Sequence, residues 1–181
     1  IQTDAAVMAV TKTHDGYEVH AAQHTYTCAK LVVATGGLSV PTLGGSGLGY
    51  QLAQQFGHAL IPTRAGLVPF TYSGKPLEQW ADLSGVALPV TARCGKAEFS
   101  NFMLITHRGL SGPAMLQISN YWTPKTSLEI DLLPNEDAHS FITQAQQARP
   151  NLALHNLLSE VLPKRFAQRM AALHGGGEAK P

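Results

Sequence analysis

The first part of the chain alternates apolar and polar residues in short stretches that are typical of β-strands. Met8–Val10 and Tyr17–His20, joined across His14–Gly16, predict a β-hairpin. Tyr26–Cys28 predicts a third strand, which leads into the apolar run Leu31–Thr35. A short apolar run of this kind is typical of a strand that is buried on both faces of an α/β sheet.

Two glycines, Gly36 and Gly37, end this run. Because glycine has no Cβ, the peptide N–H groups at these positions can come close to a phosphate or a ring. Open α/β sheets present ligands at the carboxyl ends of their strands, where these glycines are expected to lie. The same glycines also fit a tight turn that holds no ligand, and the run alone does not separate the two interpretations.

A glycine-rich loop, Gly44–Gly49, leads into a predicted amphipathic helix that ends at Gly57. Its apolar side comprises Leu48, Leu52, Ala53 and Phe56, and its polar side comprises Gln51, Gln54 and Gln55. The free amides and the positive dipole end at the start of such a helix suit a phosphate. The loop lacks the Lys-Ser/Thr pair of a Walker A motif, and it also fits a turn that needs only positive φ angles.

From about residue 75 the pattern changes to strands that follow one another without long helices between them. Val86–Arg93 alternates apolar and polar residues, with Pro89 marking a sheet edge. Phe99–Thr106 and Leu128–Leu132 are further predicted strands, and Pro76–Leu83 is a predicted short helix. This succession favours an antiparallel, barrel-like domain.

The last third of the chain is predicted to be helical. The residues expected to begin its helices are Asn135, Asn151 and Pro163. Lys164, Arg165 and Arg169 form a small basic face on the third helix, which is more typical of a solvated surface than of a partner site. Residues 175–178, Gly-Gly-Gly-Glu, are expected to end this helix and to fray.

The densest polar cluster of the chain is Thr106–Pro113. We expect Ser111 to be the N-cap of a helix that has Pro113 in its first turn. A helix N-terminus flanked by His107 and Arg108 also suits an anion, so these residues and Ser111 are candidates for substrate or anion binding. The cluster misses the Gly-x-Ser-x-Gly elbow at its last position, which argues against a serine hydrolase.

A lone basic residue, Arg64, precedes a predicted short strand over Leu67–Phe70. Its planar guanidinium could hold a substrate carboxylate or a cofactor oxygen. It could equally bond loop carbonyl groups in a structural role. The sequence leaves both interpretations open.

The composition adds bounds on function. With 44% apolar residues and a net charge of +1, the 181-residue chain has enough material for a core but no overall charge excess that would favour nucleic acid or an anionic membrane. Cys28 and Cys94 fit free thiols in a reducing compartment, and we expect a cytoplasmic protein. His20 and His24 have no third ligand at a useful spacing, so no metal site is predicted.

Four stretches of the sequence resemble one bacterial family of FAD-dependent oxidoreductases. They are Ala34–Pro41, Pro62–Phe70, Thr106–Gln117 and Leu162–Phe166. The family contains the aminoacetone-oxidase-like and BaiN-like flavoproteins of the two-dinucleotide-binding-domain superfamily. The resemblance implies two sets of FAD-contacting residues, one beside the ADP half and one nearer the isoalloxazine ring. The first set is Ala34, Thr35, Gly36 and Gly37, and the second is Ser46, Gly47 and Gly49.

Such a flavoprotein is expected to open with a Gly-x-Gly-x-x-Gly turn, which this chain does not contain. We therefore interpret the chain as a central fragment with an α+β fold. Residues 1–66 are expected to form the C-terminal part of a Rossmann-like FAD-binding domain. Residues 67–181 are expected to form a β-rich, incomplete insert domain with a helical C-terminal portion.

The function expected from this resemblance is that of a piece of an FAD-dependent oxidoreductase. The parent would bind FAD and a small-molecule substrate, with NAD(P)H as a possible electron donor, and the insert would cover the site. No side chain stands out as a catalytic acid or base. The alternative is a non-catalytic module for protein interaction or nucleotide binding.

Overall fold

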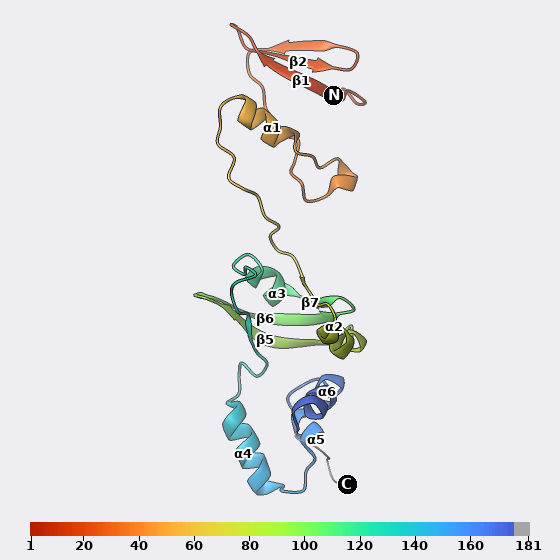
Figure 1. The fold of residues 1–181 in the computed structure, drawn as a ribbon, viewed down its shortest axis with the longest axis vertical. Helices are drawn as coiled ribbons and strands as arrows, with labels where there is room; N and C mark the ends of the chain where they lie inside the picture. The colour runs from red at the N-terminus through yellow and green to blue at the C-terminus, as the bar shows by residue number, and fades with distance from the viewer. Residues whose placement is uncertain (176–181) are drawn as a thin grey trace. The chain divides into compact units, whose positions relative to one another are not determined.

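The computed structural model describes residues 1–175, which divide into two compact units. The first unit is Ile1–Arg64 and the second begins at Ala65 (Figure 1). Both combine helices with antiparallel strands, so the chain is α+β as expected. The assignment of residues 1–66 and 67–181 to an FAD-binding domain and an insert remains a prediction.

The first unit is built on a three-stranded antiparallel sheet in the order β1-β2-β3. Its strands are β1 (Val7–Lys12), β2 (Tyr17–Ala21) and β3 (Thr25–Cys28). The register pairs Lys12 with Tyr17 at the hairpin end, which confirms the predicted hairpin. Gly16 lies in this turn at φ +152°, and a Cβ there would overlap the carbonyl group of Cys28.

Helix α1 (Leu48–Gln55) confirms the predicted amphipathic helix, and Gly57 follows it at φ +86°. Its Leu52 is buried, as is Val10 of β1. The Gln55 side-chain amide donates a hydrogen bond of 2.6 Å to the Val10 carbonyl oxygen. Burial of Leu52 and this hydrogen bond fix the helix within the first unit.

The strand that was predicted over Leu31–Thr35 is not formed in the described chain. Residues 31–37 form neither helix nor strand and pair with no strand of the first unit. Val32 is 85% exposed and Val33 is 46% exposed. A strand needs a neighbour for its N–H and C=O groups, and the sheet order β1-β2-β3 provides none for this run. The described residues therefore do not show a Rossmann-like sheet.

The second unit is built on a curled, five-stranded antiparallel sheet with the order β4-β7-β6-β5-β8. The strands are β4 (Phe70–Thr71), β5 (Ala87–Cys94), β6 (Ala97–Thr106), β7 (Gly109–Ser111) and β8 (Glu129–Asp131). These strands confirm the antiparallel, β-rich pattern. The expected strand at 67–70 is reduced to β4.

Pro89 occupies a local edge of this sheet, although β5 is an inner strand. On one side β5 pairs with β6 along its whole length, and Pro89 lies opposite Phe102. On the other side β8 pairs only with Thr91–Arg93, so it does not reach Pro89. Proline lacks an N–H donor, and it stands where the ladder on that side does not require one.

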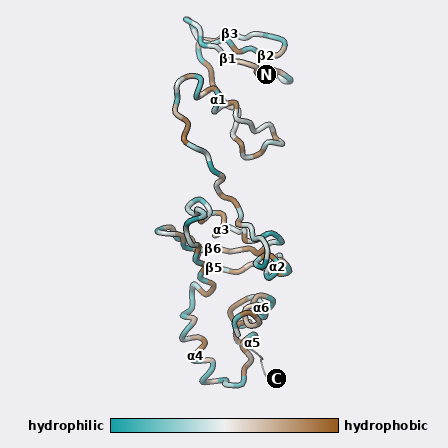
Figure 2. Tube along the Cα trace, in the orientation of Figure 1, coloured by the Kyte–Doolittle hydropathy of each residue, from teal (hydrophilic) through white to brown (hydrophobic). Residues whose placement is uncertain are grey.

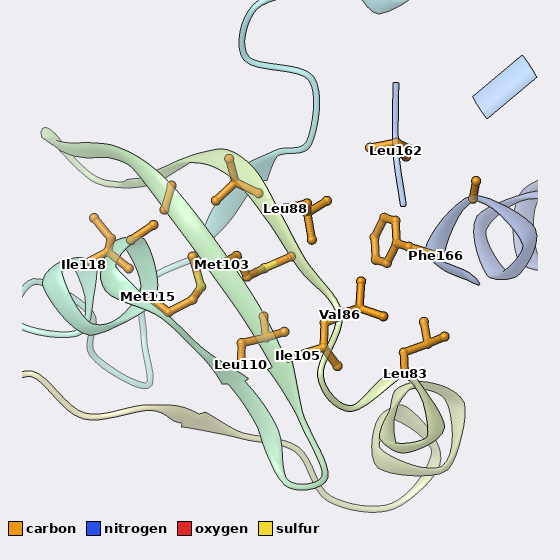
Figure 3. Packing of buried hydrophobic residues seen from close by; sticks show 14 of the residues in the cluster. Leu83, Val86, Leu88, Met103, Ile105, Leu110, Met115, Ile118, Leu162 and Phe166 are labelled. Carbon is orange, nitrogen blue, oxygen red and sulfur yellow. The ribbon is translucent and has the colours of Figure 1, made fainter. Parts of the chain in front are cut away.

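The core of the second unit fills the inner face of this sheet. In Figure 3, Met115 and Ile118 of α3 (Pro113–Ile118) approach the sheet beside Met103, and Phe166 of α6 (Lys164–His174) approaches Leu88 and Val86. The sheet residues alternate inward along β5 and β6, as the hydrophobic pattern predicted. Helix α2 (Lys75–Trp80) and the 3-10 turn η2 (Ala81–Leu83) continue the surface next to α6.

Three helices follow the sheet. They are α4 (Ala138–Ala148), α5 (Leu154–Leu158) and α6 (Lys164–His174). Asp137, not Asn135, caps α4, because its carboxylate accepts hydrogen bonds from the His139 and Ser140 amides. The second helix begins at Leu154 rather than Asn151, whereas Pro163 directly precedes α6 as expected. The predicted fraying at 176–178 lies outside the described residues.

The basic face of α6 was expected to be solvated, but two of its side chains make hydrogen bonds within the protein. The Arg165 guanidinium donates a hydrogen bond to the Asp82 carbonyl oxygen. Arg169 donates to the Gln79 carbonyl oxygen and, over 2.6 Å, to the Asp82 carboxylate. These long-range contacts join α6 to the end of α2 and to η2, which a pattern within one helix does not reveal.

Candidate functional site

The structure brings the two predicted FAD-contacting stretches together within the first unit. The loop that contains Thr35 lies against the start of α1, where a Cβ at Gly49 would come within 2.9 Å of the Thr35 hydroxyl oxygen. A Cβ at Gly37 would come within 3.3 Å of the Tyr50 hydroxyl oxygen. Residues 34–37 and 46–49 thus form one glycine-rich surface, although they are separated by a loop and the 3-10 turn η1 (Pro41–Leu43).

The glycines of this surface fall into two kinds. At Gly45 a Cβ would come within 2.5 Å of the Gly37 carbonyl oxygen, and at Gly49 it would meet Thr35, so the protein's own packing requires these glycines. At Gly36 and Gly47 a Cβ would meet no atom within 4 Å. Gly36 has φ +70°, which favours glycine for its backbone alone. Gly47 has φ −79°, a value that any residue adopts, and it is the N-cap of α1, where glycine is preferred to alanine.

The start of α1 presents main-chain donors next to this open space. The first intrahelical hydrogen bond runs from the Gln51 amide to the Gly47 carbonyl over 3.0 Å. The amides of Gly49 and Tyr50 precede that bond and belong to the unpaired first turn that every helix leaves. The Ser46 hydroxyl accepts a long hydrogen bond of 3.4 Å from the Leu48 amide. No acidic residue lies in this turn to compete with an anionic ligand.

Thr35 adds a polar atom without a partner. Its hydroxyl oxygen is buried and makes no hydrogen bond within the described residues. A buried hydroxyl without a partner costs free energy, so such atoms in native proteins commonly have a further partner such as a ligand or water. Together with the open backbone at Gly36 and Gly47, this hydroxyl fits a polar ligand such as the phosphate or ribose portion of a dinucleotide.

Arg64 lies at the end of the first unit with an exposed side chain. The residues that follow it are held by the two residues directly after helix α3. The Leu67 amide donates to the Asn120 side-chain oxygen over 3.1 Å, and the Val68 amide donates to the Ser119 hydroxyl over 3.0 Å. Ser119 and Asn120 were missed by sequence reasoning, because a contact across about fifty residues leaves no local signal in a single sequence.

The expected N-cap role of Ser111 is wrong. Ser111 lies in β7 opposite Leu104, and α3 begins after Gly112, whose neighbourhood contains no side-chain cap. Gly112 has φ +90°, and a Cβ there would come within 2.7 Å of the Phe102 carbonyl oxygen. Gly112 thus lies between the end of β7 and the start of α3. Pro113 is the first residue of the helix, as expected.

His107 and Arg108 form the tight turn between β6 and β7, with exposed side chains. All of β7 separates this turn from the start of α3, a distance of about 10 Å along a three-residue strand. The predicted pairing of these residues with a helix N-terminus is therefore not observed. The Arg108 carbonyl accepts a 2.8 Å hydrogen bond from the Tyr72 amide, and burial raises the pKa of the Tyr72 hydroxyl, which stays protonated at neutral pH.

The described residues lack the features of two other classes of protein. Residues 1–175 contain no group of three or more His, Cys, Asp and Glu side chains arranged to hold a metal ion. Within the same residues, no helix has the length and apolar character needed to cross a membrane. The cytoplasmic location stays a prediction.

The second unit of the chain matches a known protein family. A family model described as the HI0933-like protein barrel and H2TH domain matches residues 64–181. The chain therefore belongs to the HI0933-like family. The matched residues include the curled sheet and helices α2 to α6, so the family's barrel domain corresponds to the second unit. This match, with the reductase relative described below, supports an HI0933-like and BaiN-like flavoprotein family, which agrees in part with the aminoacetone-oxidase-like and BaiN-like family that the sequence motifs indicated.

Three curated relatives are similar over most of the chain. A ribosomal RNA dihydrouridine synthase of Escherichia coli is 48% identical over 92% of this chain and 42% of its own length. One of the same name from Haemophilus influenzae is 54% identical over 79% of this chain and 36% of its own. A 3-dehydro-bile acid delta(4,6)-reductase of Clostridium scindens is 28% identical over 96% of this chain and 45% of its own. The chain thus spans less than half the length of each relative.

Proposed function

We propose that this chain is the central part of a flavin-dependent reductase that acts on uridine in ribosomal RNA. The observation that carries the proposal is the identity of 48% and 54% with two relatives named ribosomal RNA dihydrouridine synthase. Dihydrouridine differs from uridine by two hydrogens added across a carbon–carbon double bond, so forming it is a two-electron reduction. The more distant relative is named as a reductase of a different substrate, which favours reduction as the shared chemistry.

This proposal revises the expectation that the partner is a small molecule and not a nucleic acid. The net charge of +1 averages over the whole chain, whereas contact with phosphates depends on the local arrangement of charged side chains. A flavoprotein that reduces RNA would also need only one nucleotide of its substrate to reach the flavin. The overall charge is therefore a weak guide to the substrate of this chain.

In the proposed protein, residues 1–66 contribute part of the FAD site and residues 67–181 form an inserted domain that covers it. FAD bound there would supply hydride transfer, with electrons from a reduced nicotinamide nucleotide. Gly36 and Gly47 would leave the backbone open to the cofactor, and the Thr35 hydroxyl and the amides at the start of α1 would donate to its polar groups. Residues that remain candidates for substrate or anion binding are Arg64, His107, Arg108 and Ser111.

The exposed apolar run at residues 31–34 supports the same arrangement. Val32 and Val33 are among the exposed large apolar residues of the first unit. In a longer protein, of the length that the relatives have, neighbouring strands would cover this run and complete a sheet. The loop at Gly36 and Gly37 would then lie at the carboxyl end of a buried strand, where α/β sheets bind dinucleotides.

The test of the proposed function uses the full-length protein. We expect the purified protein to contain flavin, and ribosomal RNA from cells that lack it to gain dihydrouridine when the protein and a reduced nicotinamide nucleotide are added. Dihydrouridine is measured by mass spectrometry of the digested RNA. A purified protein without flavin, or one with flavin that leaves the RNA unchanged, would contradict the proposal, and the first result would favour a non-catalytic module.

A second experiment tests the FAD site through Gly47. Since φ at Gly47 is −79° and a Cβ there meets no protein atom within 4 Å, Gly47→Ala should be tolerated by the fold. If the cofactor lies against this backbone, the substitution should weaken FAD binding about tenfold or more, which corresponds to about 1.4 kcal/mol. Gln54→Ala, on the exposed side of the same helix, is the matched control. Unchanged FAD affinity in Gly47→Ala would remove this residue from the site.

A further inference from the structure

Helix α6 carries a concentration of positive charge that the rest of the chain lacks. Between Lys164 and His174 it has three cationic side chains, Lys164, Arg165 and Arg169, and no acidic residue. The spacing of these residues places them on one side of the helix, with Gln168 between them, while Phe166 and Ala167 are buried on the other side. Figure 2 shows the mixed hydrophobic and hydrophilic residues of α6.

A hollow lies beside this basic side. It has a volume of about 240 Å³ and is lined by Asp82 and Leu83 of η2 and by Arg165, Gln168, Arg169 and Ala172 of α6. Both arginines are held at its rim, because each donates a hydrogen bond to a main-chain carbonyl of residues 79–82. A guanidinium fixed in this way keeps its positive charge and still has N–H donors to spare, since it has five.

Two other arginines of the second unit, Arg93 and Arg149, have carboxylate partners. Arg93 pairs with Glu98 over 2.6 Å, and Arg149 forms two hydrogen bonds with the carboxylate of Glu160 at 2.5 and 3.1 Å. On α6 the carboxylate of Asp82 contacts Arg169, whereas the contact of Arg165 in the described structure is with a neutral carbonyl group. The α6 side therefore retains an excess of positive charge, whereas the charges of Arg93 and Arg149 are balanced by carboxylates.

The position of these charges is unfavourable for the helix itself. Lys164 and Arg165 are the first two residues of α6, next to the positive end of the helix dipole, where cations cost about 0.3–1 kcal/mol. The residue before them is Pro163, which provides no side-chain cap. Helix stability thus gives no reason for two cations at this position, whereas an anionic ligand would gain from the cations and the dipole together.

We propose that Lys164, Arg165, Gln168 and Arg169 form a phosphate-binding surface for the backbone of ribosomal RNA. The inference rests on the proposed function, because that function makes RNA the polyanion that the surface meets. Arginine can donate two parallel N–H hydrogen bonds to a phosphate, and lysine adds a compact positive charge. Contacts of this kind position the RNA without reading its sequence, so the surface would add affinity and leave the choice of uridine to the flavin site.

The experiment compares two double variants of the full-length protein. Lys164→Ala with Arg165→Ala removes two charges from the surface, and Lys96→Ala with Lys125→Ala removes two exposed charges elsewhere in the same unit. Binding to in vitro transcribed ribosomal RNA is measured over a range of salt concentrations. We expect the first variant to bind about tenfold more weakly or worse, with its salt slope reduced by about two, and the control to change less than about twofold.

Folding and flavin content are checked by the melting temperature and the absorbance spectrum. Lys164→Gln alone preserves the hydrogen bond from Arg165 to Asp82 and serves if the double variant does not fold. It should weaken RNA binding by about threefold to tenfold and reduce the salt slope by about one. Neither Lys164→Gln nor the double variant of Lys164 and Arg165 should change the rate at which a reduced nicotinamide nucleotide reduces the flavin.

The possible outcomes separate this inference from the proposed function. If the wild type forms dihydrouridine and both double variants bind RNA alike, the surface assignment is wrong and the proposed function stands. If the wild type neither binds nor modifies the RNA, both are overturned. If the α6 variant instead loses binding to vesicles of anionic lipid while its RNA binding is intact, the surface serves a membrane and the inference is equally overturned.

Discussion

The two units of this chain differ in how much apolar surface they bury. In the first unit the buried apolar residues are Val10 and Leu52, while Val32 and Ile61 are more than 80% exposed. In the second unit fifteen buried residues form one cluster between the curled sheet and helices α3 and α6. Since apolar burial is the main favourable term in folding, the second unit contains the means of its own stability and the first does not.

This comparison predicts separate behaviour when the units are produced alone. Residues 65–181 should unfold in one cooperative thermal transition, because their core is complete within the unit. Residues 1–64 should show no such transition, since a single helix on a three-stranded sheet buries too little apolar surface to offset chain entropy. Circular dichroism during heating measures both. A sharp transition for residues 1–64 would contradict the comparison.

Core truncation sharpens the comparison within the intact chain. Met115 of α3 has 0% exposure, so Met115→Ala should lower the free energy of unfolding of the second unit by about 2–5 kcal/mol. Leu116→Ala, on the half-buried side of the same helix, should cost less. Val32→Ala in the first unit should change stability by less than about 0.5 kcal/mol, because Val32 is 85% exposed. Urea unfolding followed by fluorescence gives these values, and a cost at Val32 comparable with that at Met115 would show that the run is buried.

The sequence predicted the second unit well because its signals are local. Alternation along β5 and β6 follows from one buried face, and Pro163 and Pro113 stand next to helix starts for backbone reasons. The errors arose where local signals compete. Asn135 and Asp137 both suit an N-cap, and the two carboxylate oxygens of Asp137 take the amides. Ser111 resembled a cap, but pairing with β6 holds it in a strand.

The candidate site could be predicted only in part, for a different reason. The glycine-rich stretches were recognisable from their residues, and their proximity in the first unit agrees with a shared surface. The apolar run at 31–35 forms no strand in the described chain, because such a run favours burial but does not specify the neighbour that provides it. Contacts such as Arg169 with Asp82, or Leu67 with Asn120, depend on the tertiary fold and have no signal within either segment.

Glycine substitutions in the two units should differ in their cost, because the fold requires glycine at one position and not at the other. Gly112 in the second unit has φ +90° and lies against the backbone of β6, so Gly112→Ala should destabilise that unit by about 1–3 kcal/mol. Gly47 in the first unit has neither constraint, so Gly47→Ala should cost only the N-cap preference for glycine over alanine, which is at most about 1 kcal/mol in the absence of cofactor. Melting temperatures of the two variants measure this. Equal losses in both would mean that Gly47 is also required by the fold.

The smallest effect concerns the cap of α4, which tests whether the helical end of the second unit depends on local contacts. The hydrogen bond from the Ser140 hydroxyl, with those from the Ser140 and His139 amides, holds the pKa of the Asp137 carboxyl below its ordinary value. A carboxyl group whose pKa is lower in the folded state adds stability above its unfolded pKa of about 3.9, and this is lost as the pH falls through the folded pKa. Asp137→Ala should therefore be less stable than wild type at neutral pH, and the difference should shrink as the pH falls below about 4. Because the group is exposed, solvent screens its electrostatic contribution, and the loss of stability should be smaller than that for Gly112→Ala.

The urea midpoints of wild type and Asp137→Ala, measured between neutral and acidic pH, show this trend. Glu136→Ala is the control, because it removes a neighbouring carboxylate and leaves Asp137 in place. A difference between Asp137→Ala and wild type that stays constant down to the lowest pH would show that the cap does not depend on the charge of Asp137.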